Sequence, residues 1–585
     1  MKKKVVSILL ASLMMLTTVA CGITDTAKNS TSTSSLSTGE VTSDLSKVNM
    51  SKWQFDSNGN FYYQIGLSYC ETPADKSYET MGFYVPGDYF KATDNGDGTY
   101  TCSVNSDAKI GNYTVKTAPI IIPVNTPEYA AMEAPTGADS SFGYGNISDY
   151  MTAGMVIAYA GCRGKDAGAP AGVTDLKAAI RYTRYNKGVI PGDTDSIFSE
   201  GMSGGGAQSA LLGSTGDSVL YDDYLKSIGA VTGVSDSVKG SMCWCPITNL
   251  DIADEAYEWN LSSTRKGLSD EEKTYSNQMA EIYAAYINKL ALKDADGHTL
   301  TLSQSDKGIF QSGIYYDYMV SVVEDSLNHF LSDTTFPYTV GSSTSGGQMI
   351  RNGGMKNGVA PTGTADYSAM DNVSRTSTST AAVTLSGTYN TAQDYIDALN
   401  SSFTWVTYDA STNKAKITSM ADFTKALKVA SKGIAAFDQL DASQGENILF
   451  GYGDGSGAHF DSILGNLMKG TDYGDAFTKD LAKKDAEGHT VDYRVNMYNP
   501  MYYLCNYYDG YQKSHVAKFW RIRTGINQGD TALCTETNLA LALSNYSSKN
   551  KVDFATVWGQ AHTTAERTGE STANFISWVN ECMGQ

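Results

Sequence analysis

The fold of this chain is decided by the stretch Ile197-Phe198-Ser199-Glu200-Gly201-Met202-Ser203-Gly204-Gly205-Gly206-Ala207-Gln208-Ser209. It reads as a strand, a sharp turn and a helix, with Ser203 at the centre of a Gly-x-Ser-x-Gly pattern. Such a turn lifts a serine hydroxyl above a sheet edge, beside a base and backbone N–H groups, where it can act as a nucleophile. The chain has 56 glycines, so the pattern alone is weak. The flanking sequence must decide between a nucleophile and an inert serine in a glycine-rich loop.

The sharp turn at Ser203 is called the elbow below, and the sequence on both sides of it predicts an α/β-hydrolase. Residues 118–123 and 155–159 are continuous apolar runs, which are typical of buried parallel strands. Apolar residues at helical spacing follow between Gly172 and Asn186, and the next strand runs into the elbow. After the elbow and its helix, residues 238–245 read as a further strand. Strand, strand, helix, strand, elbow and helix is the order of that fold. We therefore predict a mostly parallel central sheet with helices on both faces.

The first residues predict export and a lipid anchor. Three lysines precede an apolar run, and Val19-Ala20-Cys21 resembles the cleavage site of a bacterial lipoprotein signal, whose cysteine receives lipid. Residues 1–21 are thus predicted to be the signal, although cleavage without lipid stays open. Residues 22–49 are rich in Ser and Thr and are predicted to be a disordered tether. The enzyme would stand at the outer surface of the membrane, held only through Cys21.

The remaining length predicts a hydrolase core that is interrupted by a lid. Residues 50–261 form the first part of the core, beginning with antiparallel strands, and residues 497–585 form the second part. Between them, residues 262–496 carry helical patterns, one of which begins with Ser269 and Glu272 at capping-box spacing. An insertion at this point would cover the carboxyl edge of the sheet as a lid. His298 and His489 lie in two similar turns of the lid, and we assign them no chemistry.

Charge and cysteine content restrict the partners. The formal net charge of −19 argues against nucleic acid, because the surface would repel phosphates. Eight of the nine cysteines remain if Cys21 is lipidated, which permits disulfides, although no pairing can be assigned. Cys243 and Cys245 are expected to be buried thiols, since no cluster of His and Cys residues suggests a metal. We expect no metal and no organic cofactor.

A base and an acid follow the serine in the order expected of this fold. His562 is the one histidine that follows a strand near the carboxyl terminus, and Asp530 lies in the loop after the preceding strand. Asp530 would accept a hydrogen bond from the imidazole and stabilise the imidazolium that forms when Ser203 attacks. Asp251, after an earlier strand, stays open as an alternative acid because some α/β-hydrolases place the acid there.

Several separate segments resemble bacterial tannases, which are α/β-hydrolases with a large lid that cleave galloyl esters. The likeness extends over most of the chain after about Val115, and the segments that carry it are residues 161–166, the elbow through 213, 245–251, 256–259 and 520–523. The resemblance implies an acyl-enzyme mechanism, with Ser203 as nucleophile, His562 as base and then acid, and the Gly204 N–H in the oxyanion hole. A second donor would come from residues 125–127 and stays unassigned.

Two features qualify the resemblance. In tannases the loop after the Trp-Arg-Ile-Arg strand has two acids two residues apart, one for the histidine and one for the galloyl hydroxyls, whereas this chain has Gln528-Gly529-Asp530. Either Asp530 completes the triad and the phenol contact changes, or Gln528 takes the triad position. In the lid, Lys432 and Glu446 best match the residues that bind the ring hydroxyls in tannases. An ordinary surface pair is the alternative for these two.

The sequence therefore predicts a serine esterase whose partner is a small phenolic ester, with galloyl esters first and feruloyl-type esters second. A general carboxylesterase or exopeptidase on the same fold is the second hypothesis. A binding lipoprotein that has lost catalysis is the third, and Gln528 is the residue that keeps it open.

Overall fold

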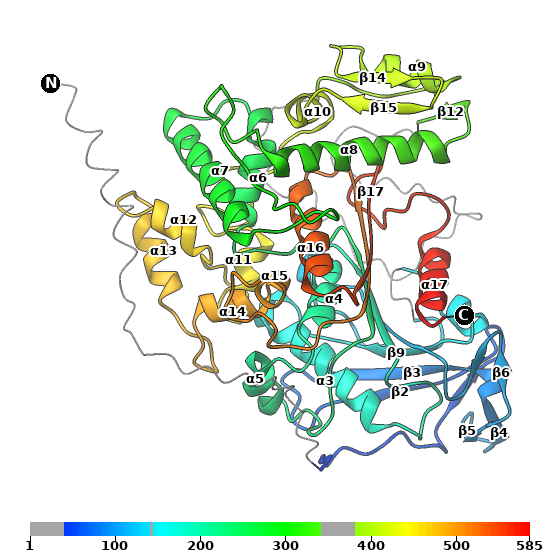
Figure 1. Cartoon of the computed structure of the whole chain (residues 1–585). Coiled ribbons are helices and arrows are strands. Elements are labelled where there is room, and N and C mark those ends of the chain that lie inside the picture. Colours follow the sequence, from blue (N-terminus) through cyan, green and yellow to red (C-terminus); the bar gives the residue numbers. More distant parts are fainter. Residues whose placement is uncertain (1–39, 141–143, 341–380, 585) are drawn as a thin grey trace, which may run out of the picture. The chain divides into compact units, whose positions relative to one another are not determined.

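A nine-stranded sheet organises the computed structural model, which describes residues 40–140, 144–340 and 381–584 (Figure 1). The strand order is β1-β2-β3-β9-β8-β10-β11-β16-β17. Strands from β9 onward in this order run parallel: β9 (Val156–Ala160), β8 (Ile120–Val124), β10 (Ile197–Met202), β11 (Gly240–Trp244), β16 (Phe519–Gly525) and β17 (Lys551–Val557). The antiparallel edge is formed by β1 (Gln54–Asp56), β2 (Phe61–Ser68) and β3 (Thr80–Pro86). This mixed, mostly parallel sheet confirms the predicted fold class.

Helices cover both faces of the sheet, as the alternation of side chains along β10 shows. The Ser199 hydroxyl lies 2.9 Å from that of Ser209 on α4 (Gly204–Ser214), so Ser199 points to one face. Its neighbour Phe198 packs edge-on against Trp578 of α17 (Ser571–Cys582), with ring centroids 5.8 Å apart. Successive side chains of a strand point to opposite faces. The sheet is therefore enclosed between α4 and α17, which explains why parallel strands such as β8 and β9 are almost entirely apolar.

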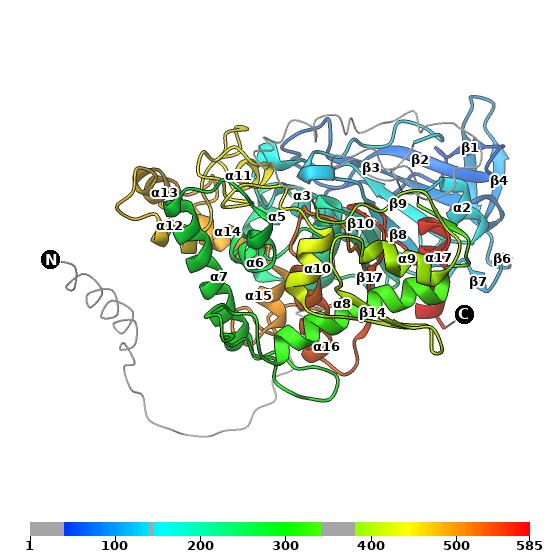
Figure 2. The same ribbon diagram turned by 90° about the horizontal axis from the view of Figure 1, so that it is seen from above.

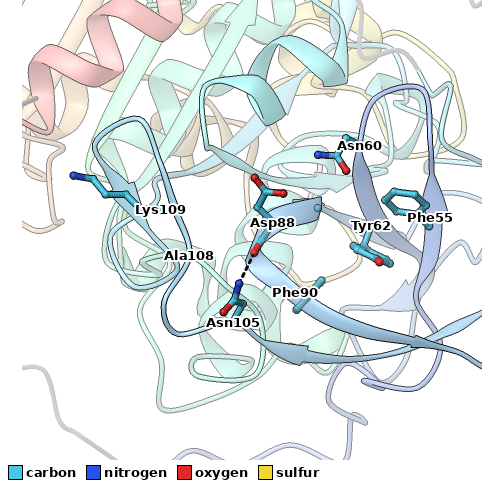
Figure 3. Close-up of a pocket in the computed structure, with 9 residues that line it drawn as sticks. Phe55, Asn60, Tyr62, Asp88, Phe90, Asn105, Ala108 and Lys109 are labelled. Carbon is cyan, nitrogen blue, oxygen red and sulfur yellow. Dashed lines mark hydrogen bonds between the residues drawn. The ribbon is translucent and has the colours of Figure 1, made fainter.

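The remaining core elements flank this sheet. They are the hairpins β4 (Phe90–Asp94) with β5 (Tyr100–Val104) and β6 (Lys109–Ile110) with β7 (Tyr113–Thr114), and the helices α2 (Ile147–Thr152), α3 (Ala171–Tyr185), α5 (Asp222–Ser227) and α16 (Leu533–Tyr546). The Asp-rich turn after Asp94 closes the hairpin of β4 and β5. Beside β4, Figure 3 shows a hollow lined by residues that include Phe55, Asn60, Asp88 and Lys109. None of its lining residues belongs to a strand end near Ser203.

The segment between β11 and β16 contains the predicted lid, residues 262–496, together with residues 253–261 and 500–504, which the prediction assigned to the core. It comprises α6 (Ala253–Leu261), α7 (Asp270–Leu290), α8 (Ile314–Asp333), β12 (Tyr338–Thr339), β13 (Thr388–Tyr389), α9 (Ala392–Leu399), β14 (Val406–Asp409), β15 (Lys414–Ile417), α10 (Met420–Leu427), α11 (Gly445–Leu449), α12 (Ser462–Leu467), α13 (Gly474–Leu481), α14 (Val491–Met497) and α15 (Pro500–Leu504). Figures 1 and 2 show two groups, α8 to α10 with β14 and β15, and α11 to α14. The link between these groups, residues 428–444, carries Lys432.

Local sequence signals within the lid are confirmed. The Ser269 side chain accepts from the Glu272 N–H while Glu272 accepts from the Ser269 N–H, which is the predicted capping box at the start of α7. The two similar turns are also present, because Lys293 bridges to Thr299 and Lys484 bridges to Thr490. None of the helices in the described residues is long and apolar enough to cross a membrane.

Residues 40–49 correct the predicted tether. The Val48 N–H donates to Asn186 Oδ1 at 2.8 Å, the Val48 side chain is buried, and Thr42 forms a bridge to Thr232. These contacts place the last ten residues of the predicted tether on the core. The prediction failed here because Ser and Thr dominate the segment, and its few apolar side chains, such as Val48, were not expected to be buried. The predicted signal and Cys21 lie outside the described residues.

The eight described cysteines are all free thiols, and seven of them are buried. Cys243 and Cys245 are among the buried ones, as the sequence predicted for this strand.

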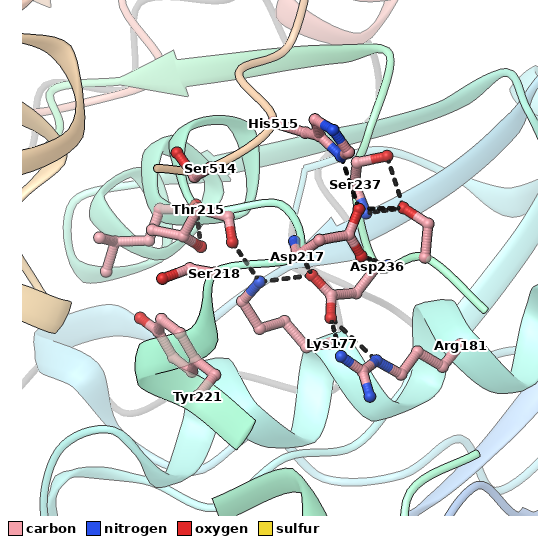
Figure 4. Close-up of polar contacts among 12 residues, drawn as sticks. Lys177, Arg181, Thr215, Asp217, Ser218, Tyr221, Asp236, Ser237, Ser514 and His515 are labelled. Atoms are coloured by element: carbon pink, nitrogen blue, oxygen red, sulfur yellow. Dashed lines mark hydrogen bonds and ion pairs between the residues drawn. The ribbon is translucent and has the colours of Figure 1, made fainter. Parts of the chain in front are cut away.

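A network of ion pairs, buried at Lys177 and Asp236 and exposed at His515, holds the far end of α4 (Figure 4). Lys177 of α3 donates to Asp236 at 2.6 Å and to the Thr215 carbonyl at 2.7 Å, directly after α4. His515, before β16, lies 2.7 Å from Asp217, and this hydrogen bond raises the pKa of its imidazole. The network ties α3, α4 and β16 together, so the helix that starts at the elbow is anchored at its carboxyl end.

Candidate active site

Ser203 occupies the sharp turn that the sequence predicts between β10 and α4. Its backbone has φ 60° and ψ −122°, a conformation that residues other than glycine adopt rarely and mostly at functional sites. A Cβ atom on Gly201 would overlap the Gly205 carbonyl, and one on Gly205 would overlap the Val124 carbonyl. The two glycines of the pattern are therefore required by close backbone packing, and the turn has the geometry of a nucleophile elbow.

The hydroxyl of Ser203 is buried and has no hydrogen-bond partner among the described residues. Leaving a buried hydroxyl unpaired costs about 1–3 kcal/mol, so such a group calls for a functional explanation. Gly204 begins α4, so its N–H has no helical carbonyl to bind. A Cβ on Gly204 would lie 2.6 Å from the Thr126 carbonyl oxygen. The loop predicted to supply the second oxyanion donor therefore lies against Gly204, although that donor stays unassigned.

His562 follows β17 and is buried, with 7% of its surface exposed. Its Nδ1 lies 2.6 Å from Gln528 Oε1 but 3.9 Å from Asp530 Oδ2. The structure thus gives Gln528 the hydrogen bond that the sequence assigned to Asp530, because the side chain two residues earlier points inward from the end of β16. Asp530 is 47% exposed and acts on His562 only through its charge. The alternative acid, Asp251, instead accepts a hydrogen bond from Tyr508.

The loop that carries His562 is held by a motif whose role the sequence did not reveal. Glu566, four residues after His562, accepts from Trp244 Nε1 at 3.0 Å and pairs with Arg521 at 2.7 Å. Arg523 pairs with Asp553 of β17 at 2.6 Å. The Trp-Arg-Ile-Arg segment that resembles tannases therefore anchors the histidine loop to two neighbouring strands. Alternating arginines in a buried strand were the signal that could have indicated such ion pairs.

The charge around His562 favours the imidazolium. Burial by itself lowers the pKa of His562, but the Asp530 charge, the neighbouring Cys245 and Glu536 raise it to about 9. Cys245 is close because its thiol donates to the Thr563 carbonyl at 3.3 Å. A general base must be neutral to accept a proton, so the free enzyme would hold its base in the charged form at neutral pH.

Two segments of the lid contact loops at the carboxyl edge of the sheet. Ser431 Oγ donates to the Gly529 carbonyl at 2.9 Å, and Lys428 donates to the Gln528 carbonyl. Lys432 follows directly, buried, with its ammonium 3.9 Å from the centroid of the Phe437 ring. These contacts place Lys432 beside the loop that holds Gln528 and Asp530.

Glu446 approaches from the other lid segment. It is buried on α11, and α11 lies over the 3₁₀ turns Pro127–Tyr129 and Lys165–Ala167, which follow β8 and β9. Glu446 is 6% exposed and Lys432 is 9% exposed. They are therefore not the ordinary surface pair that the sequence left open.

The chain is similar to known proteins in sequence and in fold. The family model described as BD-FAE matches residues 115–289, which include the elbow. A tannase from Fusobacterium nucleatum is similar with 26% identity, a TM-score of 0.67, and coverage of 92% of this chain and 99% of the other. For a tannin acyl hydrolase from Lactobacillus plantarum the values are 23%, 0.64, 89% and 94%.

A tannin acyl hydrolase in complex with ethyl gallate is similar with 24% identity and a TM-score of 0.62, covering 89% of this chain and 94% of that one. No curated protein matches the sequence. The shared architecture extends over core and lid alike. This chain is therefore an α/β-hydrolase with the tannase-like fold, and its residues 115–289 match the BD-FAE family.

Proposed function

We propose that this protein is a serine esterase that hydrolyses esters of phenolic acids, galloyl esters first, through an acyl-enzyme. The observation that carries the proposal is the elbow, where Ser203 has a strained backbone and an unpaired, buried hydroxyl. His562 would take the serine proton and later give it to the leaving alcohol, while Gly204 would stabilise the oxyanion. Water would then release the acid by the same steps.

The substrate class is supported by the lid and by one comparison. Lys432 and Glu446 are buried on two lid segments, one of which contacts the Gln528–Asp530 loop while the other lies over the turns that follow β8 and β9. A buried ammonium and carboxylate suit a ring with several hydroxyls, because a ring without them would leave both groups unpaired. A similar structure contains ethyl gallate. We therefore place galloyl esters before feruloyl-type esters.

The test is a substrate panel in which Lys432→Met is compared with the wild type. We expect the variant to lower kcat/KM for methyl gallate by about 10- to 100-fold and to change hydrolysis of methyl benzoate little, because only the gallate ring needs the ammonium. Lys425→Met is the matched control, since Lys425 also lies over an aromatic ring in the lid, 4.2 Å from the Phe403 centroid. Equal losses on both esters would contradict the proposed ring contact.

The pH profile provides an independent prediction. Because the pKa of His562 is raised to about 9, kcat/KM should rise up to about pH 9 and fall about tenfold per pH unit below it. Asp530→Asn removes the largest charge that raises this pKa, so the acidic limb should move to lower pH. The exposed Asp306→Asn serves as control. An unchanged limb in Asp530→Asn would show that Asp530 does not act on the base.

A binding protein without catalysis is the second candidate, because an uncharged Gln528 contacts the histidine. A fluorophosphonate probe distinguishes the two, since only an activated serine reacts with it. We expect stoichiometric labelling of the wild-type protein at Ser203.

We also propose that the enzyme is lipid-anchored at the cell surface through Cys21. Metabolic labelling with a lipid analogue, compared with Cys21→Ser, would test this.

A further inference from the structure

The amide of Gln528 bridges the histidine to a buried carboxylate. Gln528 Oε1 lies 2.6 Å from His562 Nδ1, and Gln528 Nε2 donates to Glu536 Oε1 at 2.8 Å and to Thr524 Oγ1 at 2.5 Å. All of these side chains are buried, and Glu536 is completely inaccessible. Glu536 stands in the first turn of α16, and it is the only charged residue between Asp530 and Lys549. The sequence thus isolates one acid where the structure completes a chain of hydrogen bonds.

The carboxylate decides which way the amide faces. An ionised carboxylate only accepts hydrogen bonds, so Gln528 must turn its NH₂ group toward Glu536 and its oxygen toward His562. The oxygen in turn requires a proton on Nδ1, which leaves the Nε2 lone pair free for the serine proton. A reversed amide would present an N–H to Nδ1 and enforce the wrong tautomer. A neutral glutamine can support a general base here only if something fixes its orientation.

The same carboxylate supplies the charge that glutamine lacks. Thr531 Oγ donates to Glu536 Oε1 at 2.6 Å, and the buried Lys428 lies nearby, bonded to the Gln528 carbonyl. The other charged or titratable groups that influence His562 are Asp530 and Cys245. Hydrogen bonds in a chain polarise one another inside a protein. When His562 gains a proton, the Glu536 charge can stabilise it through the amide.

We propose that Glu536 is a positioning residue that acts through Gln528 on His562, so that the pair Gln528–Glu536 does the work of a triad acid. No proton reaches Glu536: the serine proton moves to His562 Nε2 and then to the leaving alcohol. This inference rests on the proposed function, because it concerns the base of that serine mechanism.

The first test is Glu536→Gln, which keeps shape and removes charge. We expect kcat to fall about 10- to 100-fold with KM changed less than about threefold, because two amides can face either way. The acidic limb of kcat/KM should also move to lower pH, since a negative charge near the imidazolium is lost. A change that affected only packing would not move that limb. Glu200→Gln is the matched control, a buried glutamate in β10 that accepts from Tyr150 at 2.6 Å, and it should leave the limb unchanged.

The decisive test exchanges the two groups. In Gln528→Glu/Glu536→Gln the carboxylate contacts His562 directly and the amide lies behind it. We expect kcat to return to within about fivefold of the wild type, even if Glu536→Gln is less stable. Thermal unfolding of each variant accompanies the kinetics.

Three outcomes would overturn the proposal. These are an unchanged rate and pH limb in Glu536→Gln, an exchange variant no better than that single variant, or a kcat loss without a shift of the limb. Failure of the proposed function is distinguishable, because the wild-type protein would then neither hydrolyse esters nor react with fluorophosphonate, which overturns both.

Discussion

Ser203→Ala is expected to lower kcat for the best phenolic ester by about 10⁴- to 10⁶-fold, to the level left by binding and the oxyanion hole. The loss should be this large because no other hydroxyl can take its position: the strained turn and the glycines on both sides admit a single side chain. Steady-state hydrolysis and fluorophosphonate labelling measure it. Stability should not fall and should rise by up to about 1–3 kcal/mol, since the variant removes a buried hydroxyl that makes no hydrogen bond among the described residues.

The control for this variant is Ser214→Ala at the other end of α4. Ser214 is also buried, and its hydroxyl donates to the Ala210 carbonyl at 2.8 Å within the helix. Its activity should stay within about twofold of the wild type, because the hydrogen bond is local. A Ser203→Ala enzyme that retained more than about one hundredth of the wild-type rate would exclude the acyl-enzyme mechanism.

Gly525→Ala is expected to destabilise the protein by about 3 kcal/mol or more and to reduce activity in the fraction that folds. Gly525 ends β16, where an added Cβ would overlap the Ala561 carbonyl and lie 2.6 Å from the Gln560 carbonyl oxygen. Backbone atoms cannot move aside as a flexible side chain can. Relief of the overlap must therefore displace residues 560–562, and His562 with them.

Denaturant unfolding and kcat together check this second prediction. Gly445→Ala is the control, because the nearest atom to its added Cβ is the Lys165 ammonium at 3.4 Å, at the end of a flexible chain. That variant should change the free energy of unfolding by less than about 0.5 kcal/mol. If Gly525→Ala were as stable as the control, this would contradict the inference that the ends of β16 and β17 pack too closely to admit a Cβ atom at Gly525.

Local patterns predicted the elements well where one physical signal dominated. The apolar runs became β8 and β9, Ser269 caps α7, and Ser203 lies at the turn between β10 and α4. Each of these features depends on burial, helix termini or backbone sterics within a few residues. The prediction of a disordered tether was wrong for residues 40–49. The Val48 N–H donates to Asn186, and this contact joins residues that are far apart in the sequence.

The candidate site was predicted in part. Ser203 and His562 follow from motif and chain order, and the structure brings Lys432 beside the Gln528 loop. The partner of His562 could not be read from spacing. Gln528 and Asp530 are both near the end of β16, and only side-chain direction and burial separate a hydrogen bond of 2.6 Å from a distance of 3.9 Å. The anchoring of the histidine loop by Arg521 and Glu566 was missed for the same reason.

The sequence by itself determined the fold class, the elbow and the order of serine and histidine, because these depend on periodicity and on glycines that short-range sterics require. Only the tertiary structure decided what supports the histidine. Gln528, Glu536 and Thr524 meet where a strand end, a loop and the start of a helix pack together, and burial makes their hydrogen bonds obligatory. Such a meeting has no signature in the sequence beyond a single acid in an otherwise uncharged helix.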